Sequence, residues 1–164
     1  MATLHMLIGI PGSGKSTYAK NILMAKHKDA FYLASDKIRD NNPNVAENDI
    51  WPIIYDTLAS YLKDGHDVIY DATNFNKKYR DIVKERLRER NVIDYDMKAY
   101  FFKTDVDVCI NRVKKRNNVV GERYLPIDVI MSYQDRLEMP TKEEGFLEVH
   151  VIDNTKNKKK YEVK

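Results

Sequence analysis

The sequence has little cysteine, no long hydrophobic run and little net charge. Its single cysteine, Cys109, excludes an intramolecular disulfide, as is usual for a protein in a reducing compartment. No apolar run approaches the ~20 residues that a membrane-spanning helix needs, and the N-terminus lacks the basic and apolar segments of a secretory signal. We therefore expect a cytoplasmic protein that has no membrane partner.

The histidines do not form a recognisable metal-binding pattern. Their spacing along the chain matches no common ligand motif, and no second cysteine is present to complete one. The four histidines are His5, His27, His66 and His150. A formal net charge of +3 is too small to establish a nucleic-acid partner, but it permits one, because local basic clusters matter more than the total.

What the sequence does contain is a regular alternation of apolar runs and amphipathic stretches. Strands are predicted by apolar runs at residues 4–8, 31–34, 68–70, 99–102 and 149–152. Helices are predicted by helical spacing of apolar residues from near residue 15, and over 50–63, 77–90, 106–113 and 127–137. This alternation is typical of an α/β fold, with a parallel sheet of about five strands and helices on both faces. The length favours a single domain, 1–164.

A glycine-rich segment after the first predicted strand fits the phosphate-binding pattern G-x-x-x-x-G-K-[ST] in full. We expect ATP to be bound here by Gly9, Pro11, Gly12, Ser13, Gly14, Lys15, Ser16 and Thr17. The glycines let N–H groups face the phosphates, and the following helix adds partial positive charge. Lys15 would reach the β- and γ-phosphates, and Ser16 would bind Mg²⁺. Because the segment lies between a predicted strand and a predicted helix, a phosphate-binding loop is favoured over a chance turn. Such a loop in turn predicts the three-layer sandwich of the P-loop NTPases.

Two other classes of P-loop protein are disfavoured by the sequence. GTPases normally carry a guanine-reading Asn-Lys-x-Asp motif, but the nearest string here, residues 76–79, ends in Tyr79. ATPase motors usually place a glutamate after the acidic residue that ends a second apolar strand, whereas Asp71 is followed by Ala72. Both differences favour a kinase, in which a substrate hydroxyl replaces water as the nucleophile.

Polar residues follow the second predicted strand, at the edge of the sheet where α/β enzymes place their sites. Asp36 and Arg39 are three residues apart and share one helical face. Asp36 is a candidate general base for an attacking hydroxyl, and Arg39 a candidate contact to an anionic acceptor group, ideally a phosphate. The alternative is that Ser35 or Asp36 only caps a helix and that Arg39 is a solvated charge.

The third predicted strand ends in Asp71-Ala72-Thr73-Asn74, at the same edge. Asp71 is a candidate for holding Mg²⁺ through a bound water or for orienting Lys15. Thr73 and Asn74 are short hydrogen-bonding residues suited to placing a substrate. The same four residues would also make an ordinary turn, so the two interpretations stay open.

Arg112 and Arg116 lie four residues apart beside the apolar stripe of helix 106–113, before the polar segment 117–124. We expect residues 112–126 to form a helical lid over ATP, in which the arginines neutralise charge on the transferred phosphate. The alternative is a set of solvated cations near a helix C-terminus. For Arg123, at the far end of this segment, we favour the solvated cation.

Together these segments resemble the P-loop kinase family that includes the bacteriophage 5′-hydroxyl polynucleotide kinases. The resemblance runs from residue 7 to about 152 and rests on residues 9–17, 35–39, 71–74, 112–116, 125–130 and 144–146. It implies Asp36 as general base, Arg39 at the acceptor's 3′-phosphate and Thr73 near the acceptor. It also implies catalytic roles for Lys15 and Arg116 at the donor phosphates, with Ser16 beside them and Arg112 as a supporting lid residue.

The resemblance leads us to expect an ATP- and Mg²⁺-dependent kinase of DNA or RNA 5′-hydroxyl ends, in the host cytoplasm if the chain is phage-encoded. No second acidic D-x-D-x-T site is found, so 3′-phosphatase activity is not expected. Kinases of nucleosides, sugars or antibiotics use the same frame and remain the alternative. A non-catalytic nucleotide-binding module is a third hypothesis. Residues 156–160 are expected to form a basic turn or tail, and the oligomeric state stays open.

Overall fold

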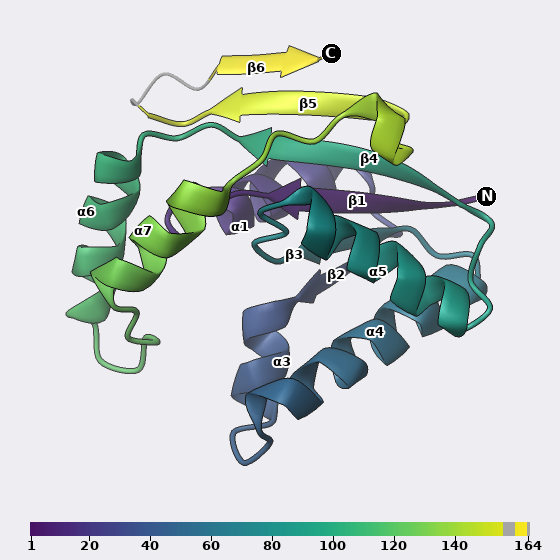
Figure 1. Ribbon diagram of the computed structural model, residues 1–164, viewed down its shortest axis with the longest axis horizontal. Coiled ribbons are helices and arrows are strands. Elements are labelled where there is room, and N and C mark those ends of the chain that lie inside the picture. The colour runs from purple at the N-terminus through teal and green to yellow at the C-terminus, as the bar shows by residue number, and fades with distance from the viewer. Residues whose placement is uncertain (156–159, 164) are drawn as a thin grey trace.

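The computed structural model describes residues 1–155 and 160–163 and arranges their strands in one six-stranded sheet (Figure 1). The strand order across the sheet is β2-β3-β1-β4-β5-β6. The strands β1 to β5 run parallel, and β6 pairs antiparallel with β5. Their bounds are β1 Ala2–Ile8, β2 Phe31–Ala34, β3 Val68–Asp71, β4 Tyr95–Phe102, β5 Glu148–Asp153 and β6 Lys160–Val163.

Helices cover both faces of this sheet. The short elements α1 (Lys15–Tyr18), the π-helical η1 (Ala19–Leu23) and α2 (Met24–Lys26) follow one another directly on one side. The remaining helices are α3 Ser35–Asn41, α4 Glu47–Lys63, α5 Lys77–Glu89, α6 Val106–Asn117, α7 Ile127–Arg136 and the 3₁₀ turn η2 Lys142–Glu144. Figure 1 shows α4 and α5 in front of the strands and α1 behind them. Among the described residues, no helix combines the length and the apolar character needed to cross a membrane.

The alternation of side chains along β1 explains why helices pack on both faces. Leu4 and Met6 point to one face and join the larger hydrophobic cluster, which includes Leu58 of α4. Leu7 points to the opposite face and packs with Leu23 of η1 in a second cluster. Side chains on both sides of the strand are buried, and only Thr3 is partly exposed, as is typical of a central parallel strand. The predicted α/β sandwich with five parallel strands is therefore confirmed.

Two details of the elements differ from the sequence-based expectations. The strand β6 is not predicted, because its four residues follow a lysine run and show no apolar run of their own. Its backbone pairs with β5, with Lys160 opposite Asp153, and so covers an edge that would otherwise expose unpaired polar groups. Residues 156–159 of the predicted basic tail lie outside the described residues, and at Lys160 the tail prediction is wrong.

The start of α3 also corrects an expectation. The helix begins at Ser35 itself, with Ala34 in the N-cap position, so the cap predicted for Ser35 or Asp36 is wrong. Asp36 instead lies in the first helical turn, where the partial positive charge of the helix terminus favours a carboxylate. Asp36 therefore does not cap α3, and its role as a general base stays a prediction.

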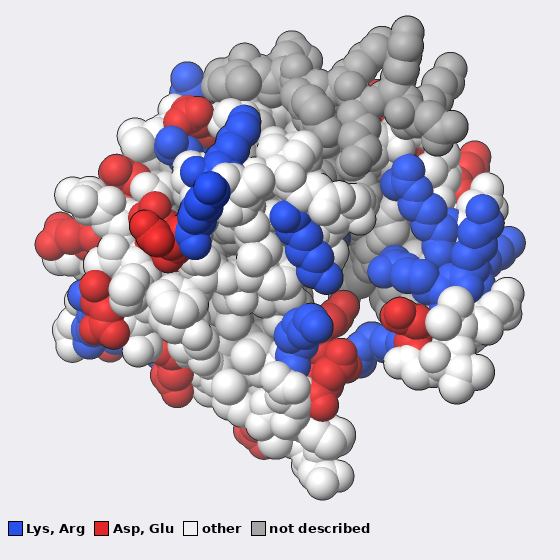
Figure 2. Space-filling model, turned by 180° about the vertical axis from the view of Figure 1, so that it is seen from behind, with Lys and Arg blue, Asp and Glu red and all other residues white. Residues whose placement is uncertain are grey.

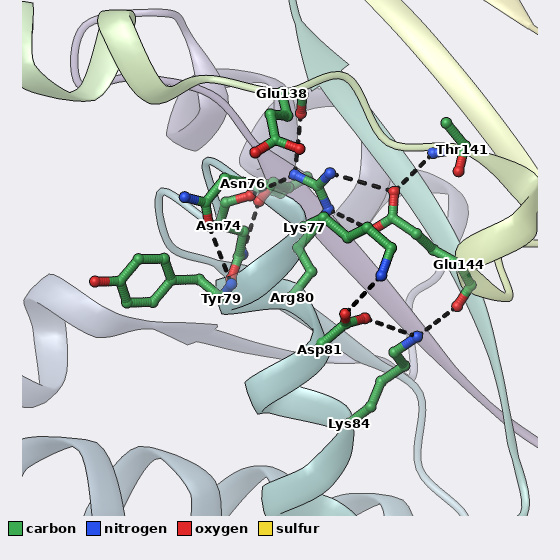
Figure 3. Close-up of polar contacts among 11 residues, drawn as sticks. Asn74, Asn76, Lys77, Tyr79, Arg80, Asp81, Lys84, Glu138, Thr141 and Glu144 are labelled. Carbon is green, nitrogen blue, oxygen red and sulfur yellow. Dashed lines mark hydrogen bonds and ion pairs between the residues drawn. The ribbon is translucent and has the colours of Figure 1, made fainter.

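A buried ion pair joins α5 to the segment that precedes β5 (Figure 3). Arg80 Nε and Nη2 donate to the two carboxylate oxygens of Glu144 at 2.8 and 3.2 Å, and the side chains are 1% and 2% exposed. Arg80 Nη1 also donates to the carbonyls of Asn74 and Glu138, both at 3.0 Å. Glu144 in turn accepts from the backbone N–H of Thr141. The pair is thus hydrogen-bonded on several sides, which is the condition under which buried charges are tolerated.

We predict that Arg80→Met lowers the free energy of unfolding by about 3–5 kcal/mol, because the charge of Glu144 is left buried without its partner. Urea unfolding followed by circular dichroism measures the loss, and the double variant Arg80→Met/Glu144→Leu is expected to recover part of it. The control Arg86→Met removes a more exposed pair with Glu89 and should cost less than about 1 kcal/mol. Equal losses in the two single variants would contradict the prediction.

Candidate active site

The phosphate-binding loop links the carboxyl end of β1 to α1, and it is closely packed between two other elements. Gly12 and Gly14 adopt φ angles of 82° and 96°, which residues with side chains avoid. A Cβ on Gly12 would lie 2.6 Å from the carbonyl oxygen of Cys109 in α6. A Cβ on Gly14 would lie 2.4 Å from Nδ2 of Asn154, just beyond β5. The loop conformation therefore depends on glycine at both positions.

Three side chains from outside the loop hold its carbonyl groups. Thr104 Oγ1 and Asn154 Nδ2 both donate to the carbonyl of Ser13, at 2.9 and 3.2 Å. Arg112 donates to the carbonyls of Gly12, at 3.0 Å, and Asn154, at 2.7 Å. Thr104 and Asn154 were missed by sequence reasoning, because each follows a strand without belonging to a motif. Arg112 contacts the loop backbone, and its contact with the nucleotide stays a prediction.

The hydroxyl of Ser13 fits a loop that binds phosphate. This Oγ is buried and has no hydrogen-bond partner among the residues that the structure describes. A buried hydroxyl without a partner costs free energy, and a phosphate oxygen would supply one. The N–H groups of Gly9 and Ser13 already donate to the carbonyls of Thr73 and Ile10, so the other N–H groups of the loop would receive an anion.

Lys15 is the cation at the centre of the site. Its Nζ donates to two carbonyls of the loop at 2.8 and 3.0 Å. Burial lowers the pKa of Lys15, while the carboxylates of Asp71 and Asp36 act to raise it and Arg116 acts to lower it. All three charges are therefore near enough to act on Lys15. The structure thus brings together predicted residues from the loop, α3, β3 and α6.

Asp71, at the end of β3, accepts hydrogen bonds from two hydroxyls. Its Oδ2 lies 2.7 Å from Ser16 Oγ and 2.5 Å from the phenol oxygen of Tyr32. Burial, together with the Asp71 carboxylate, raises the pKa of Tyr32, so the phenol stays protonated and donates. Tyr32 was missed by sequence reasoning, because it lies inside an apolar run. The Ser16 hydroxyl and the Asp71 carboxylate are adjacent hard oxygen ligands, and they fit Mg²⁺.

The residues after Asp71 contact the backbone of the central strand. Gly9 N donates to the carbonyl of Thr73 at 3.1 Å, which ties this segment to the phosphate-binding loop. Asn74 is buried, with φ 46°, and its Nδ2 donates to the carbonyl of Leu7 at 2.9 Å. The hydrogen bond from the Asn74 amide therefore holds this segment against β1. Substrate contacts by Thr73 and Asn74 stay predictions.

Asp36 and Arg39 share one face of α3, as predicted, and form an ion pair of 2.8 Å. The same guanidinium donates to both carboxylate oxygens of Glu47 in α4, at 2.8 to 3.1 Å, and lies over the Trp51 ring. The side chain of Arg39 is 18% exposed and that of Asp36 is 70% exposed. The alternative that Arg39 is a solvated charge is therefore wrong. Glu47 was missed, since it is contributed by a different helix.

The predicted lid carries basic residues toward α3. The last turn of α6 contains Lys114, Lys115 and Arg116. Figure 2 shows Lys and Arg side chains gathered on this side of the molecule, across a hollow from the part that carries α3. Arg123, between α6 and α7, pairs with Asp40 of α3 at 3.2 Å and lies 4.0 Å from Asp36. Arg123 is exposed, as expected of a solvated cation, and its ion pair with Asp40 in addition links the lid segment to α3.

The strand order, the phosphate-binding loop and the charged groups at the strand ends define a P-loop nucleotide-binding protein. The chain belongs to the AAA domain family, whose model matches residues 4–140. Its fold is similar to that of a gluconokinase from Sinorhizobium meliloti 1021, with a TM-score of 0.61 and 16% identity over 94% of this chain and 83% of that one. The similarity to a P-loop kinase is thus confirmed at the level of the fold.

Two structures connected with RNA share this fold. A chain of the Pnkp1/Rnl/Hen1 RNA repair complex matches with a TM-score of 0.68 and 24% identity, over 83% of this chain and 44% of that one. A fungal RNA kinase matches with a TM-score of 0.67 and 17% identity, over 94% of this chain and 39% of that one. This chain therefore spans less than half the length of either. At these identities the likeness establishes the fold and leaves the acceptor open.

We predict that Gly14→Ala weakens binding of Mg·ATP about tenfold or more, which corresponds to at least ~1.4 kcal/mol. The added methyl displaces Asn154, which holds the loop carbonyl. Isothermal titration calorimetry measures the affinity. The matched control is Gly65→Ala, which has a similar φ of 83° but no described atom within 4 Å of the new Cβ. Equal affinities in the two variants would show that the close approach at Gly14 is unimportant.

Proposed function

We propose that this chain is an ATP-dependent polynucleotide 5′-hydroxyl kinase, which transfers the γ-phosphate of ATP to the 5′-OH end of DNA or RNA. The observation that carries the proposal is that Asp36, which is paired with Arg39, lies near enough for its charge to act on Lys15. A carboxylate and an anion-binding group thus stand on the acceptor side of the phosphate-binding loop. The fold shared with a fungal RNA kinase supports the same acceptor class.

In the proposed reaction, the 5′-hydroxyl oxygen forms a bond to the γ-phosphorus while the bond between that phosphorus and the bridging oxygen of ADP breaks. Asp36 accepts the hydroxyl proton, and its exposed carboxylate is open to an incoming acceptor. Lys15 and Arg116 offset negative charge on the transferred group. Ser16 and Asp71 would hold Mg²⁺, which supplies positive charge to the β- and γ-phosphate oxygens.

Arg39 gives the proposed site its preference for a nucleotide. A planar guanidinium binds a phosphate through two parallel hydrogen bonds, so Arg39 suits the 3′-phosphate of the terminal nucleotide. In the structure this guanidinium is hydrogen-bonded to Glu47. We propose that the acceptor phosphate replaces the Glu47 carboxylate. The last turn of α6, which contains Lys114 and Lys115, would then attract the rest of the polynucleotide backbone.

A kinase of a small uncharged molecule is the second candidate, and the pairing of Arg39 favours it. Since Asp36 and Glu47 already bind this guanidinium, an uncharged acceptor would enter without displacing either. The discriminating assay incubates the protein with γ-labelled ATP and a 5′-hydroxyl oligonucleotide, a nucleoside 3′-monophosphate, a free nucleoside or an uncharged sugar. We expect label on the first two. Label only on the last two would favour the second candidate, and label on none would reject the kinase proposal.

We predict that Asp36→Asn lowers the rate of transfer about 10²–10⁴-fold, because the amide cannot take up the hydroxyl proton. The affinity for Mg·ATP should change little, and calorimetry with the same variant checks this. Asp81→Asn is the matched control, because Asp81 is also an exposed carboxylate paired with a basic residue of its own helix. A near-normal rate with Asp36→Asn would show that another group is the base.

We also predict a change of acceptor preference in Arg39→Gln. The loss of the guanidinium should reduce kcat/KM for a nucleoside 3′-monophosphate by at least roughly tenfold, since a charge-assisted hydrogen bond contributes about 1.5–3 kcal/mol. The value for the corresponding nucleoside without the phosphate should change much less. Steady-state kinetics with the two acceptors gives the ratio. An equal effect on both acceptors would mean that Arg39 only supports the fold around α3.

A further inference from the structure

A second group of potential ligands lies toward the amino ends of the strands, whereas the phosphate-binding loop follows the carboxyl end of β1. His5 lies within β1, His27 directly follows α2, and Asp67 directly precedes β3. One potential metal-ligating atom from each residue lies within 4.8 Å of the other two. The three residues come from segments far apart in the sequence. Only the fold therefore brings them together.

His5 has a nitrogen for which the protein provides no partner among the described residues. The residue is 1% exposed, and its Nδ1 lies 2.8 Å from the phenol oxygen of Tyr100. Its Nε2 is also buried, and no described residue hydrogen-bonds to it. An unsatisfied nitrogen in the interior destabilises the folded state, and such groups are rare in native proteins. A bound cation would satisfy this nitrogen.

The surroundings hold His5 in the form that binds metals. Burial, together with the neighbouring His27, lowers the pKa of His5 to about 4, so its ring is uncharged at neutral pH. Burial also raises the pKa of Tyr100, so the phenol stays protonated and its oxygen is able to accept a hydrogen bond. When Nδ1–H donates to this oxygen, Nε2 carries the free lone pair. Metal-binding histidines commonly donate their second ring N–H to an oxygen in this way.

The other two ligands are also placed by contacts within the fold. The ring of His27 lies beside that of His5, with 4.3 Å between the ring centroids. Asp67 Oδ1 accepts a hydrogen bond from the backbone N–H of Thr3 at 2.8 Å, which orients the carboxylate. His27 and Asp67 are only partly buried. An ion and a water molecule therefore have access to the site from solvent.

We propose that His5, His27 and Asp67 bind a divalent transition-metal ion of the zinc type. Two imidazoles and one carboxylate make a ligand set that Zn²⁺ accepts, with water in the fourth position. Bonds of about 2.0–2.2 Å place the ligands of a tetrahedral ion roughly 3.4 Å apart, so small side-chain movements complete the site. Mg²⁺ prefers oxygen ligands and belongs with Ser16 and Asp71.

The ion would join β1 to the segment between α2 and β2 and to the start of β3. A ligand that binds only the folded chain raises its stability by mass action. We therefore assign this ion a role in stability that is independent of phosphoryl transfer. The sequence-based expectation that no histidine takes part in a metal site is reversed by this proposal.

The test is a zinc titration of the full chain without an affinity tag, after treatment with EDTA and dialysis. Excess Mg²⁺ is present throughout, so that Ser16 and Asp71 are not available to zinc. Competition with a chromophoric chelator gives affinity and stoichiometry, and the visible spectrum of Co²⁺ gives the coordination number. We expect one Zn²⁺ per chain, and at least roughly tenfold weaker binding in His27→Gln and in Asp67→Asn.

His66→Gln is the matched control, because His66 is the exposed neighbour of Asp67 but lies outside the cluster. It should bind zinc as the unmodified chain does. The two partly buried positions are chosen because replacing His5 would also disturb the core, whereas Asp67→Asn keeps the oxygen that accepts from Thr3. The proposal is overturned if zinc does not bind stoichiometrically, if His27→Gln binds as tightly as the unmodified chain, or if His66→Gln is weakened equally.

Discussion

The close approach of α6 and of the end of β5 to the phosphate-binding loop is the constraint on which the site depends. A side chain at Gly12 would collide with the backbone of α6, and one at Gly14 would collide with Asn154. The same elements supply Arg112 and Asn154, whose hydrogen bonds hold the loop carbonyls. Packing and hydrogen bonding thus act on the same short segment, and together they fix the conformation of the loop.

The central position of β1 connects this loop to the rest of the candidate site. Because β3 and β4 flank β1 in parallel, residues that follow these strands arrive at the same edge of the sheet. Asp71 ends β3 beside Ser16, and Thr104 follows β4 and binds the loop. The buried pair of Arg80 and Glu144 supports this edge from outside the sheet, since Arg80 holds the carbonyl of Asn74.

The positions of the charges are compatible with the transfer reaction that we propose. Lys15 is partly buried, and the opposing charges of Asp71 and Asp36 both act on it. Asp36 is exposed, and Arg39 is held between this carboxylate and that of Glu47. A donor group bound by the loop would therefore meet a carboxylate and a guanidinium at the neighbouring strand end. The histidine cluster lies toward the opposite end of the strands. The metal site that we propose for stability is therefore separate from the site that we propose for phosphoryl transfer.

The sequence by itself determined the parts of this protein whose physics is local. The motif at residues 9–16 needs only neighbouring glycines and a following helix, and the alternation of apolar runs was enough to predict five parallel strands. The spacing of Asp36 and Arg39 also placed them correctly on one helical face. Tertiary structure decided the partners of these residues, including Tyr32, Glu47 and Asn154, and it paired β6 with β5. Such contacts join segments distant in sequence, and their geometry follows from packing that no local pattern encodes.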